Sequence, residues 1–203
     1  MAAVSKEQPK SPRARLFVAL DLPDEVRTGI AAWGREALAD PALRPVSLES
    51  LHITLAFLGH RPEGEIEQIA ETVRESVGPA PWIELLDPVQ RPPRGRARLY
   101  ALPALSPGAE ALQAGLQQGL VEGGFYEPEK RPFWPHVTVA RVRPEARGSR
   151  RPAVTSDPPG KLPEGLSEAF LGVRMALYRS ELQPTGARYM PLAQVKLPGA
   201  GWQ

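Results

Sequence analysis

The tetrapeptide His-x-Thr-x occurs twice in the sequence, as His-Ile-Thr-Leu at residues 52–55 and as His-Val-Thr-Val at residues 136–139. Both copies lie in apolar runs that are typical of β-strands. Successive side chains in a strand point to opposite faces, so each copy places its histidine and threonine on one face and its aliphatic residues on the other. The pattern predicts two strands, one in each half of the chain, with similar polar faces above a core.

The other apolar runs do not alternate regularly between strand and helix. Strands are predicted at residues 15–21, 51–57, 82–86, 98–102, 136–141, 170–182 and 187–197, and helices at about 23–38, 65–77 and 108–121. Several strands follow one another without a helix between them, which excludes a purely parallel sheet. Residues 183–186 (Gln-Pro-Thr-Gly) have turn chemistry and predict a hairpin. We expect an α+β protein with antiparallel-rich sheets and an internal pseudo-repeat of two lobes.

One domain is expected after a short tail. Residues 1–13 are polar and lack the apolar stretch of a signal peptide, so they predict a disordered tail on a cytoplasmic protein. Residues 14–203 are the predicted domain, and no apolar run in the chain approaches the roughly 20 residues of a membrane span. Residues 144–163 are rich in Pro, Gly, Ser and Arg, which predicts a long, exposed, flexible basic loop.

Positive charge is clustered although the formal net charge is only +2. Arginines occur at positions 91, 94, 96 and 98 and again at 141, 143, 147, 150 and 151. Locally basic segments on a nearly neutral protein permit a polyanionic partner. Solvated loop charge is the alternative interpretation, and composition alone does not separate the two.

The paired histidines and threonines suit chemistry on a phosphate. Opening a cyclic phosphodiester with water requires one group that removes a proton and one that supplies a proton. Histidine can do either, because its ordinary pKa is near 6.5. Thr54 and Thr138 lie two residues after their histidines, on the same face, and can donate hydrogen bonds to non-bridging phosphate oxygens. Two rings on separate strands can lie on opposite sides of one phosphorus atom.

A metal site is not expected. Zinc in catalytic sites usually takes three protein ligands, often including a carboxylate, and neither tetrapeptide has an aspartate or glutamate at ligand spacing. The chain has no cysteine, which excludes thiolate ligands and disulfides. We therefore predict that no metal or other cofactor is required.

The longer motifs around the two histidines resemble those of a known family. Residues 51–59 (LHITLAFLG) and 135–141 (PHVTVAR) are similar to the motifs of the 2H phosphoesterase superfamily, and within it to the RNA 2′,3′-cyclic phosphodiesterases, also called 2′-5′ RNA ligases. Residues 15–20 (RLFVAL), 178–182 (YRSEL) and 186–189 (GARY) fit as well. The resemblance extends over residues 15–197. A single His-x-Thr-x would be weak evidence, but two copies are specific.

This resemblance implies a bilobal α+β fold with a central cleft, two antiparallel-rich sheets, outer helices and lobes related by a pseudo-twofold axis. It implies metal-independent hydrolysis of an RNA 2′,3′-cyclic phosphate to a 2′-phosphate, with His52 as proton donor and His136 as proton acceptor. The expected partner is RNA with a cyclic phosphate end, for example a tRNA fragment. We expect the protein to act as a monomer.

Other residues near the motifs are candidates for binding the substrate or for structural roles. Arg141 lies five residues after His136, so strict alternation places it on the opposite face unless a bulge turns it back to the cleft, where it would bind phosphate. Phe17 and Tyr178 are candidates for stacking on a nucleobase, with core packing as the alternative for Phe17. His60 follows Gly59 and is expected to be an exposed loop residue.

Three alternative functions stay open at this point. Ligation of 2′-5′ linked RNA is the same reaction in reverse, and the sequence does not separate the two directions. A non-catalytic module that binds RNA ends would use the same cleft, although the complete set of histidines and threonines argues against it. A related activity on small cyclic nucleotides is the third, and the arginine-rich segments favour a longer polyanion.

Overall fold

The computed structural model describes residues 12–183 and 186–199. Its strands are β1 (Arg13–Asp21), β2 (Leu43–Pro45), β3 (His52–Pro62), β4 (Trp82–Leu85), β5 (Val89–Arg91), β6 (Leu99–Leu105), β7 (His136–Val142), β8 (Phe170–Leu171), β9 (Arg174–Gln183) and β10 (Gly186–Lys196). Its helices are α1 (Asp24–Ala37), α2 (Ile66–Glu75), α3 (Pro107–Glu122) and α4 (Glu164–Ser167), with 3-10 turns at Leu48–Ser50 and Glu63–Glu65. The α+β class is confirmed.

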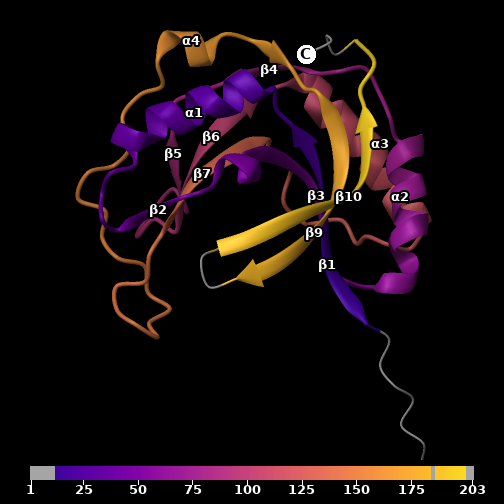
Figure 1. The fold of residues 1–203 in the computed structure, drawn as a ribbon, viewed down its shortest axis with the longest axis horizontal. Helices are drawn as coiled ribbons and strands as arrows, with labels where there is room; N and C mark the ends of the chain where they lie inside the picture. Colours follow the sequence, from indigo (N-terminus) through magenta and orange to yellow (C-terminus); the bar gives the residue numbers. More distant parts are fainter. Residues whose placement is uncertain (1–11, 184–185, 200–203) are drawn as a thin grey trace, which may run out of the picture.

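The strands form one ten-stranded sheet in which every pairing is antiparallel. The strand order is β10-β9-β1-β3-β7-β6-β4-β8, and β2 and β5 pair with β7 and β6 beside this path (Figure 1). The two strands that carry His-x-Thr-x, β3 and β7, are neighbours at the middle of this order. Their registered contact is a single pair, Ile53 opposite Val137. The sequence predicted two sheets, whereas the structure joins them into one; the division into two lobes stays a prediction.

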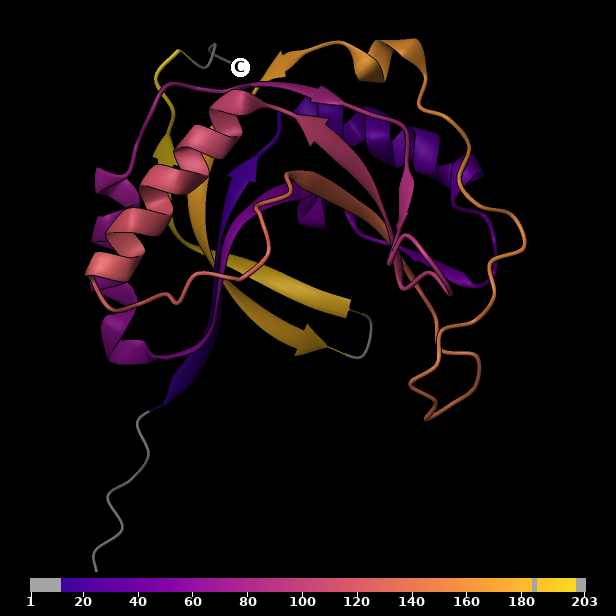
Figure 2. The same ribbon diagram turned by 180° about the vertical axis from the view of Figure 1, so that it is seen from behind.

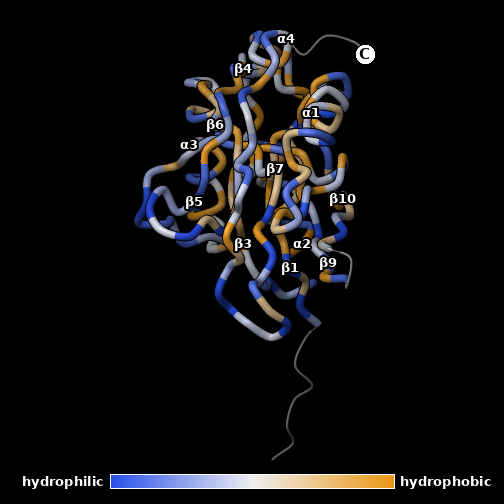
Figure 3. Tube along the Cα trace, turned by 90° about the vertical axis from the view of Figure 1, so that its left-hand side faces the viewer, coloured by the Kyte–Doolittle hydropathy of each residue, from blue (hydrophilic) through white to orange (hydrophobic). Residues whose placement is uncertain are grey.

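The helices cover different parts of the sheet. Helix α2 packs against β9 and β10, and α3 contacts α2, β3 and β4. Helices α1 and α4 contact each other on the far side of the molecule from α2, as Figures 1 and 2 both show. Apolar residues run along the central strands and polar residues along the outer loops in Figure 3. Within the described residues, no helix is both long enough and apolar enough to cross a bilayer.

The core lies beneath the motif strands, as the alternation predicted. Ile53 and Val137 are completely buried, and Leu55 and Val139 are 3% and 2% exposed. The histidines and threonines of the same strands are only partly buried. The aliphatic half of each tetrapeptide therefore holds its strand on the core while the polar half faces out of it.

Each motif strand has a β-bulge directly after its threonine. Along β1 and β3 the register moves from Ala19 opposite Thr54 to Val18 opposite Ala56, so that Leu55 has no partner. Along β6 and β7 the register moves from Ala101 opposite Thr138 to Tyr100 opposite Ala140, which leaves Val139 without a partner. A bulge shifts the alternation by one residue. The internal repeat therefore includes this irregularity as well as the tetrapeptide.

Several predicted boundaries were wrong. Strand β3 continues past Gly59, which has a φ of 69° beside a second register shift, and ends at Pro62. His60 is exposed as predicted, but it lies in this strand and not in a loop. The short strands β2 and β5 were missed, because three residues give too little pattern to detect, and the strand predicted at residues 170–182 is divided into β8 and β9.

The chain ends and the hairpin turn are only partly described. Strand β1 begins at Arg13, so the last residue of the predicted tail belongs to the sheet, and residues 1–11 lie outside the described part. The predicted hairpin joins β9 to β10, and its two central residues, 184–185, lie outside it as well.

The predicted loop at residues 144–163 is mostly exposed and has no helix or strand, but it is attached to the domain. The carboxylate of Asp40 accepts hydrogen bonds from the backbone N–H groups of Ser156 and Asp157, at 2.8 Å each. These donors hold the pKa of Asp40 below its usual range. The Trp33 indole donates to the Lys161 carbonyl at 3.0 Å. The flexibility of this loop stays a prediction.

The pairing of β3 with β7 predicts a sensitive core position. Replacing Ile53 by Ala removes buried methyl groups at the contact with Val137 and should lower the free energy of unfolding by about 2–5 kcal/mol. Urea denaturation followed by circular dichroism measures this change. Val154→Ala is the control, because Val154 is 67% exposed and its truncation should change little. Equal effects of the two substitutions would contradict this account of the core.

Candidate active site

The two His-x-Thr-x motifs face one pocket. It has a volume of about 350 Å³, which lies in the range of small-ligand sites. Its walls are formed by Arg44, Pro45, Val46, Ser47, Ser50, His52, Thr54, His136, Thr138, Arg141, Gln183, Gly186, Ala187 and Tyr189. Strands β3 and β7 supply the histidines and threonines, and the β9–β10 hairpin supplies the opposite wall. Both predicted pairs and Arg141 are therefore brought together, while Phe17 and Tyr178 do not line this pocket.

The bulges decide which residues follow the threonines on the pocket wall. Arg141 lies five residues after His136. Because the unpaired Val139 shifts the alternation by one residue, the side chain of Arg141 returns to the pocket face. Phe57 lies five residues after His52, and the bulge at Leu55 has the same effect there: Phe57 lines the continuation of the pocket. The sequence analysis considered a bulge for Arg141 but did not consider Phe57. The shared spacing of the two motifs was the signal that could have found it.

Arg44 is a second pocket residue that the sequence analysis missed. It lies on β2 directly opposite Arg141 on β7. Like charges directly opposite on adjacent strands are unfavourable. Nevertheless, no carboxylate of the described residues forms an ion pair with either arginine. The pair therefore forms a positive wall suited to an anion.

The imidazole of His52 lies among aromatic rings. It stacks on Phe17 with ring centroids 5.1 Å apart and meets the edge of Tyr189 at 5.5 Å. This apolar burial is the main reason why the pKa of His52 falls from 6.5 to about 4, and the positive charge of a protonated His136 lowers it further. His52 is neutral near pH 7 in the ligand-free site.

Phe17 and Tyr178 support His52 from behind. Phe17 is only 4% exposed, and its ring centroid lies 5.1 Å from that of His52 and 5.3 Å from that of Tyr178, while the centroids of His52 and Tyr178 are 6.4 Å apart. The Tyr178 hydroxyl donates to the carboxylate of Asp21 at 2.9 Å, and Arg174 donates to the same carboxylate at 2.6 Å. Burial and the Asp21 charge raise the pKa of Tyr178. These contacts favour packing over the predicted nucleobase stacking for both rings.

His136 is held by its neighbour two residues earlier. Its Nδ1 lies 2.7 Å from the Trp134 carbonyl, and the indole of Trp134 stacks on the imidazole at 4.0 Å. The Arg91 guanidinium lies over the Trp134 ring, 3.7 Å from its centroid. Burial and the Arg91 charge lower the pKa of His136, while the hydrogen bond to the carbonyl opposes them. That bond leaves Nε2 as the nitrogen available to a ligand.

The donor groups of the pocket do not form a metal site. Within residues 12–183 and 186–199, no group of three or more His, Cys, Asp or Glu side chains is arranged to hold a metal ion. The polar groups on the pocket wall are instead imidazoles, hydroxyls and guanidinium groups. Such a set matches the oxygen atoms of a phosphate.

Comparison with known proteins agrees with this geometry. The family model of the 2′-5′ RNA ligase superfamily matches residues 22–162, a span that contains both motifs. The chain belongs to this superfamily. A relative from Thermus thermophilus, named RNA 2′,3′-cyclic phosphodiesterase, is 35% identical over 91% of each chain. A relative of the same name from Escherichia coli is 31% identical over 88% of this chain and 93% of its own.

Solved structures share the fold of this superfamily member. The crystal structure of TT0787 from Thermus thermophilus has a TM-score of 0.73 and 32% identity, and the match covers 91% of this chain and 98% of that one. Escherichia coli LigT complexed with 3′-AMP has a TM-score of 0.71 and 26% identity, over 92% of this chain and 99% of its own. The resemblance inferred from the motifs is therefore confirmed over nearly the whole chain.

The low pKa of His52 predicts a particular acid sensitivity. In the unfolded chain this imidazole titrates near 6.5, whereas in the folded chain its pKa is about 4. Protons therefore bind the unfolded state more tightly, and stability present above pH 6.5 is lost as the pH falls toward 4. At about 1.4 kcal/mol per pH unit, His52 accounts for a loss of at most about 3.5 kcal/mol.

His52→Gln should remove this part of the acid sensitivity. Urea unfolding at pH 7 and pH 4.5 measures it, and the variant should lose less stability than the parent protein between these values. The His52 ring resonance in NMR, assigned through its disappearance in the variant, should titrate near pH 4. An ordinary midpoint near 6.5 would contradict the described surroundings of the ring.

Proposed function

We propose that the protein hydrolyses RNA 2′,3′-cyclic phosphate ends to 2′-phosphates by metal-independent acid–base catalysis with two histidines. The observation that carries this proposal is the convergence of His52, Thr54, His136 and Thr138 on one pocket. The relatives named RNA 2′,3′-cyclic phosphodiesterase support the substrate class. The related LigT structure with 3′-AMP supports a nucleotide as the ligand of this fold.

The proposed reaction is an in-line displacement at phosphorus. A water oxygen forms a bond to phosphorus while its proton passes to His136. The bond from phosphorus to the ribose 3′ oxygen breaks, and His52 supplies a proton to that oxygen. The products are a 2′-phosphate and a free 3′-hydroxyl. Afterwards His136 carries a proton and His52 lacks one, so exchange with solvent restores the starting state.

The donor role of His52 requires an effect of the substrate. The ring is neutral near pH 7 in the ligand-free pocket, because its pKa is about 4. A phosphodiester anion bound beside it raises this pKa, since an opposite charge within a few ångströms favours the protonated ring. Binding of the substrate would therefore raise the pKa of His52 toward neutral pH, so that the ring can carry the proton that it donates.

The threonines and Arg141 would stabilise the charge that builds up on phosphorus. Each threonine hydroxyl lies two residues from its histidine on the same face, and its stiff β-branched side chain limits the motion of the donor. Arg141 can donate two parallel hydrogen bonds to phosphate oxygens. The Nε2 atom of His136 faces the ligand when Nδ1 donates to Trp134.

Ligation of RNA through a 2′-5′ bond is the second candidate function, favoured by the matching superfamily model. In it a 5′-hydroxyl takes the place of the attacking water: its oxygen forms a bond to phosphorus and the bond from phosphorus to the ribose 3′ oxygen breaks, so ligation is a parallel of the hydrolysis and not its reverse. His136 would remove the proton of the 5′-hydroxyl and His52 would protonate the 3′ oxygen, so the two histidines would keep their roles. A monomeric state, a cytoplasmic location and tRNA fragments as substrates stay predictions.

Replacement of either histidine tests the proposal. His52→Ala and His136→Ala should each lower kcat on uridine 2′,3′-cyclic phosphate by about 10²–10⁴-fold, because each removes a proton-transfer group. Circular dichroism should show that both variants remain folded. The parent protein should keep its activity in excess EDTA. Parent-level turnover in both variants would contradict the proposal, and loss of activity in EDTA would contradict the metal-independent mechanism.

A substrate with sulfur in place of the 3′ bridging oxygen separates the two roles. A thiolate leaves without protonation, so loss of the proton donor matters less with this substrate. His52→Ala should recover most of its lost activity on the sulfur substrate, whereas His136→Ala should not. Recovery by His136→Ala alone would reverse the assignment of donor and acceptor.

A further inference from the structure

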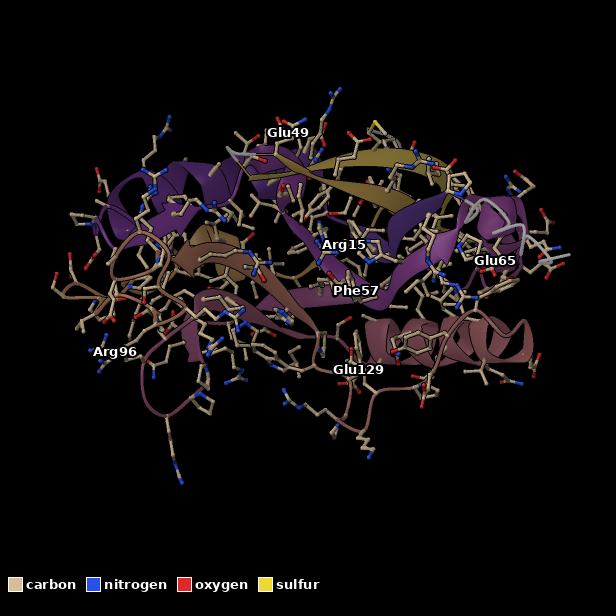
Figure 4. The ribbon with its side chains drawn as sticks, turned by 90° about the horizontal axis from the view of Figure 1, so that it is seen from below. Arg15, Glu49, Phe57, Glu65, Arg96 and Glu129 are labelled. Atoms are coloured by element: carbon tan, nitrogen blue, oxygen red, sulfur yellow. The ribbon has the colours of Figure 1, made fainter. Side chains whose placement is uncertain are left out.

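The indole of Trp134 contacts both the His136 imidazole and a positive charge. The indole and the imidazole are nearly parallel, with centroids 4.0 Å apart and an angle of 15° between their planes. The guanidinium of Arg91 lies over the same indole, 3.7 Å from the ring centroid. Figure 4 shows the loop of Arg96, which follows Arg91, and the segment of Glu129, which leads to Trp134, on the same side of the molecule. Two segments that are distant in the sequence therefore meet at this stack.

The backbone around Arg91 is held in place by hydrogen bonds. Arg91 is the last residue of β5 and lies opposite Leu99 on β6. The backbone N–H of Arg98 donates to the Arg91 carbonyl at 2.7 Å. The side-chain amide of Gln90 lies within hydrogen-bond distance, 3.3–3.4 Å, of three carbonyls in residues 92–95. The guanidinium therefore extends toward the indole from a defined backbone position, and a cation over an indole face is attracted to it.

The surroundings of His136 contain no negative charge that would stabilise a protonated ring. In many enzymes a carboxylate accepts a hydrogen bond from the Nδ1 atom of the reacting histidine and stabilises the imidazolium. Here the acceptor is the uncharged carbonyl of Trp134. Across the described chain, Arg91 forms no ion pair, so no carboxylate neutralises its charge. The charged or titratable groups around the ring are His52 on β3, Arg44 on β2, Arg141 on β7, Tyr189 on β10 and Arg91 on β5, and none of them is a carboxylate.

We propose that Arg91 is a positioning residue for His136: the Trp134 indole holds its positive charge beside the imidazole, which keeps Nε2 free to accept the proton of the attacking water. This inference rests on the proposed function, in which His136 is the proton acceptor. A second positive charge on the imidazole is unfavourable beside the guanidinium, because like charges repel more strongly in a partly buried site than in water. In agreement, burial and the Arg91 charge both lower the pKa of His136. The Trp134 carbonyl fixes the tautomer, and Arg91 disfavours protonation by solvent.

An NMR titration of the His136 ring tests the proposal without measuring activity. Arg91→Met removes the charge but keeps a long, unbranched side chain that can cover the indole. The titration midpoint of His136 should rise by about half a unit to one unit in this variant and should stay near the parent value in Arg91→Lys. The chain has three histidines, so His136→Ala identifies the signal. Arg94→Met is the matched control, because Arg94 is exposed in the loop that follows and lies over no aromatic ring of the described residues.

The pH dependence of turnover separates this role from a structural one. Relative to the parent protein, the loss of kcat/KM in Arg91→Met on uridine 2′,3′-cyclic phosphate should be about threefold to tenfold greater at pH 5 than at pH 8. At pH 5 more of the His136 rings are protonated in the variant, whereas at pH 8 the ring is neutral in both proteins. An equal loss at the two pH values would overturn the proposal, because Arg91 would then serve the fold or attract the substrate.

A double-mutant cycle tests the part played by the indole. In Trp134→Leu the guanidinium has no ring to hold it, so adding Arg91→Met should shift the His136 midpoint by less than half as much as in the parent protein. An equal shift in both backgrounds would overturn the proposal, as would an unshifted midpoint in Arg91→Met with an unchanged circular dichroism spectrum. No hydrolysis by the parent protein would instead overturn the proposed function, and the NMR titration would still report on the stack.

Discussion

The contact between Ile53 and Val137 holds the candidate site together. These two buried residues pair β3 with β7 at the middle of the sheet, although each strand belongs to a different half of the chain. Because side chains alternate along a strand, the core contact between Ile53 and Val137 places the polar residues of both strands on the same side of the sheet. His52, Thr54, His136 and Thr138 therefore meet through the burial of their aliphatic neighbours. The free energy that positions the polar groups comes from the hydrophobic core.

The two halves of the pocket are similar in backbone but different in environment. Both strands have a bulge after the threonine, and both bring the residue at the fifth position after the histidine back to the pocket. That residue is Phe57 in one half and Arg141 in the other. His52 is surrounded by aromatic rings, whereas His136 has a backbone acceptor and a stacked indole. The same backbone thus places two chemically distinct imidazoles, as acid–base catalysis with separate roles requires.

Much of this arrangement could be predicted from the sequence, because strand alternation depends only on local pattern. The core positions of Ile53, Leu55, Val137 and Val139 followed from it, whereas the shared pocket of the motifs was implied by the family resemblance. The meeting of β3 with β7 in one sheet did not, because strand order depends on contacts between distant segments. Arg44 was missed for a related reason: its strand β2 has only three residues, and the pairing of β2 with β7 is what places Arg44 opposite Arg141.

The aromatic residues show a second limit of sequence reasoning. Phe17 and Tyr178 were candidates for base stacking, but the sequence does not state which rings are covered by others. In the structure Phe17 is almost completely covered although it lines the continuation of the pocket, Tyr178 lines neither part of the pocket, and Phe57 has the exposed ring. The bulge at Leu55 decides this difference, and bulges depend on the register between two strands.

A crystal structure with a uridine vanadate complex would test the central claim most directly. Vanadate bound to the ribose oxygens takes the five-coordinate geometry of the displacement at phosphorus. The account predicts that the rings of His52 and His136 lie within hydrogen-bond distance, about 2.6–3.2 Å, of the two apical oxygens, one ring on each side. If both apical oxygens lie away from one of the rings, or if both rings lie on the same side of vanadium, the two-histidine mechanism is wrong.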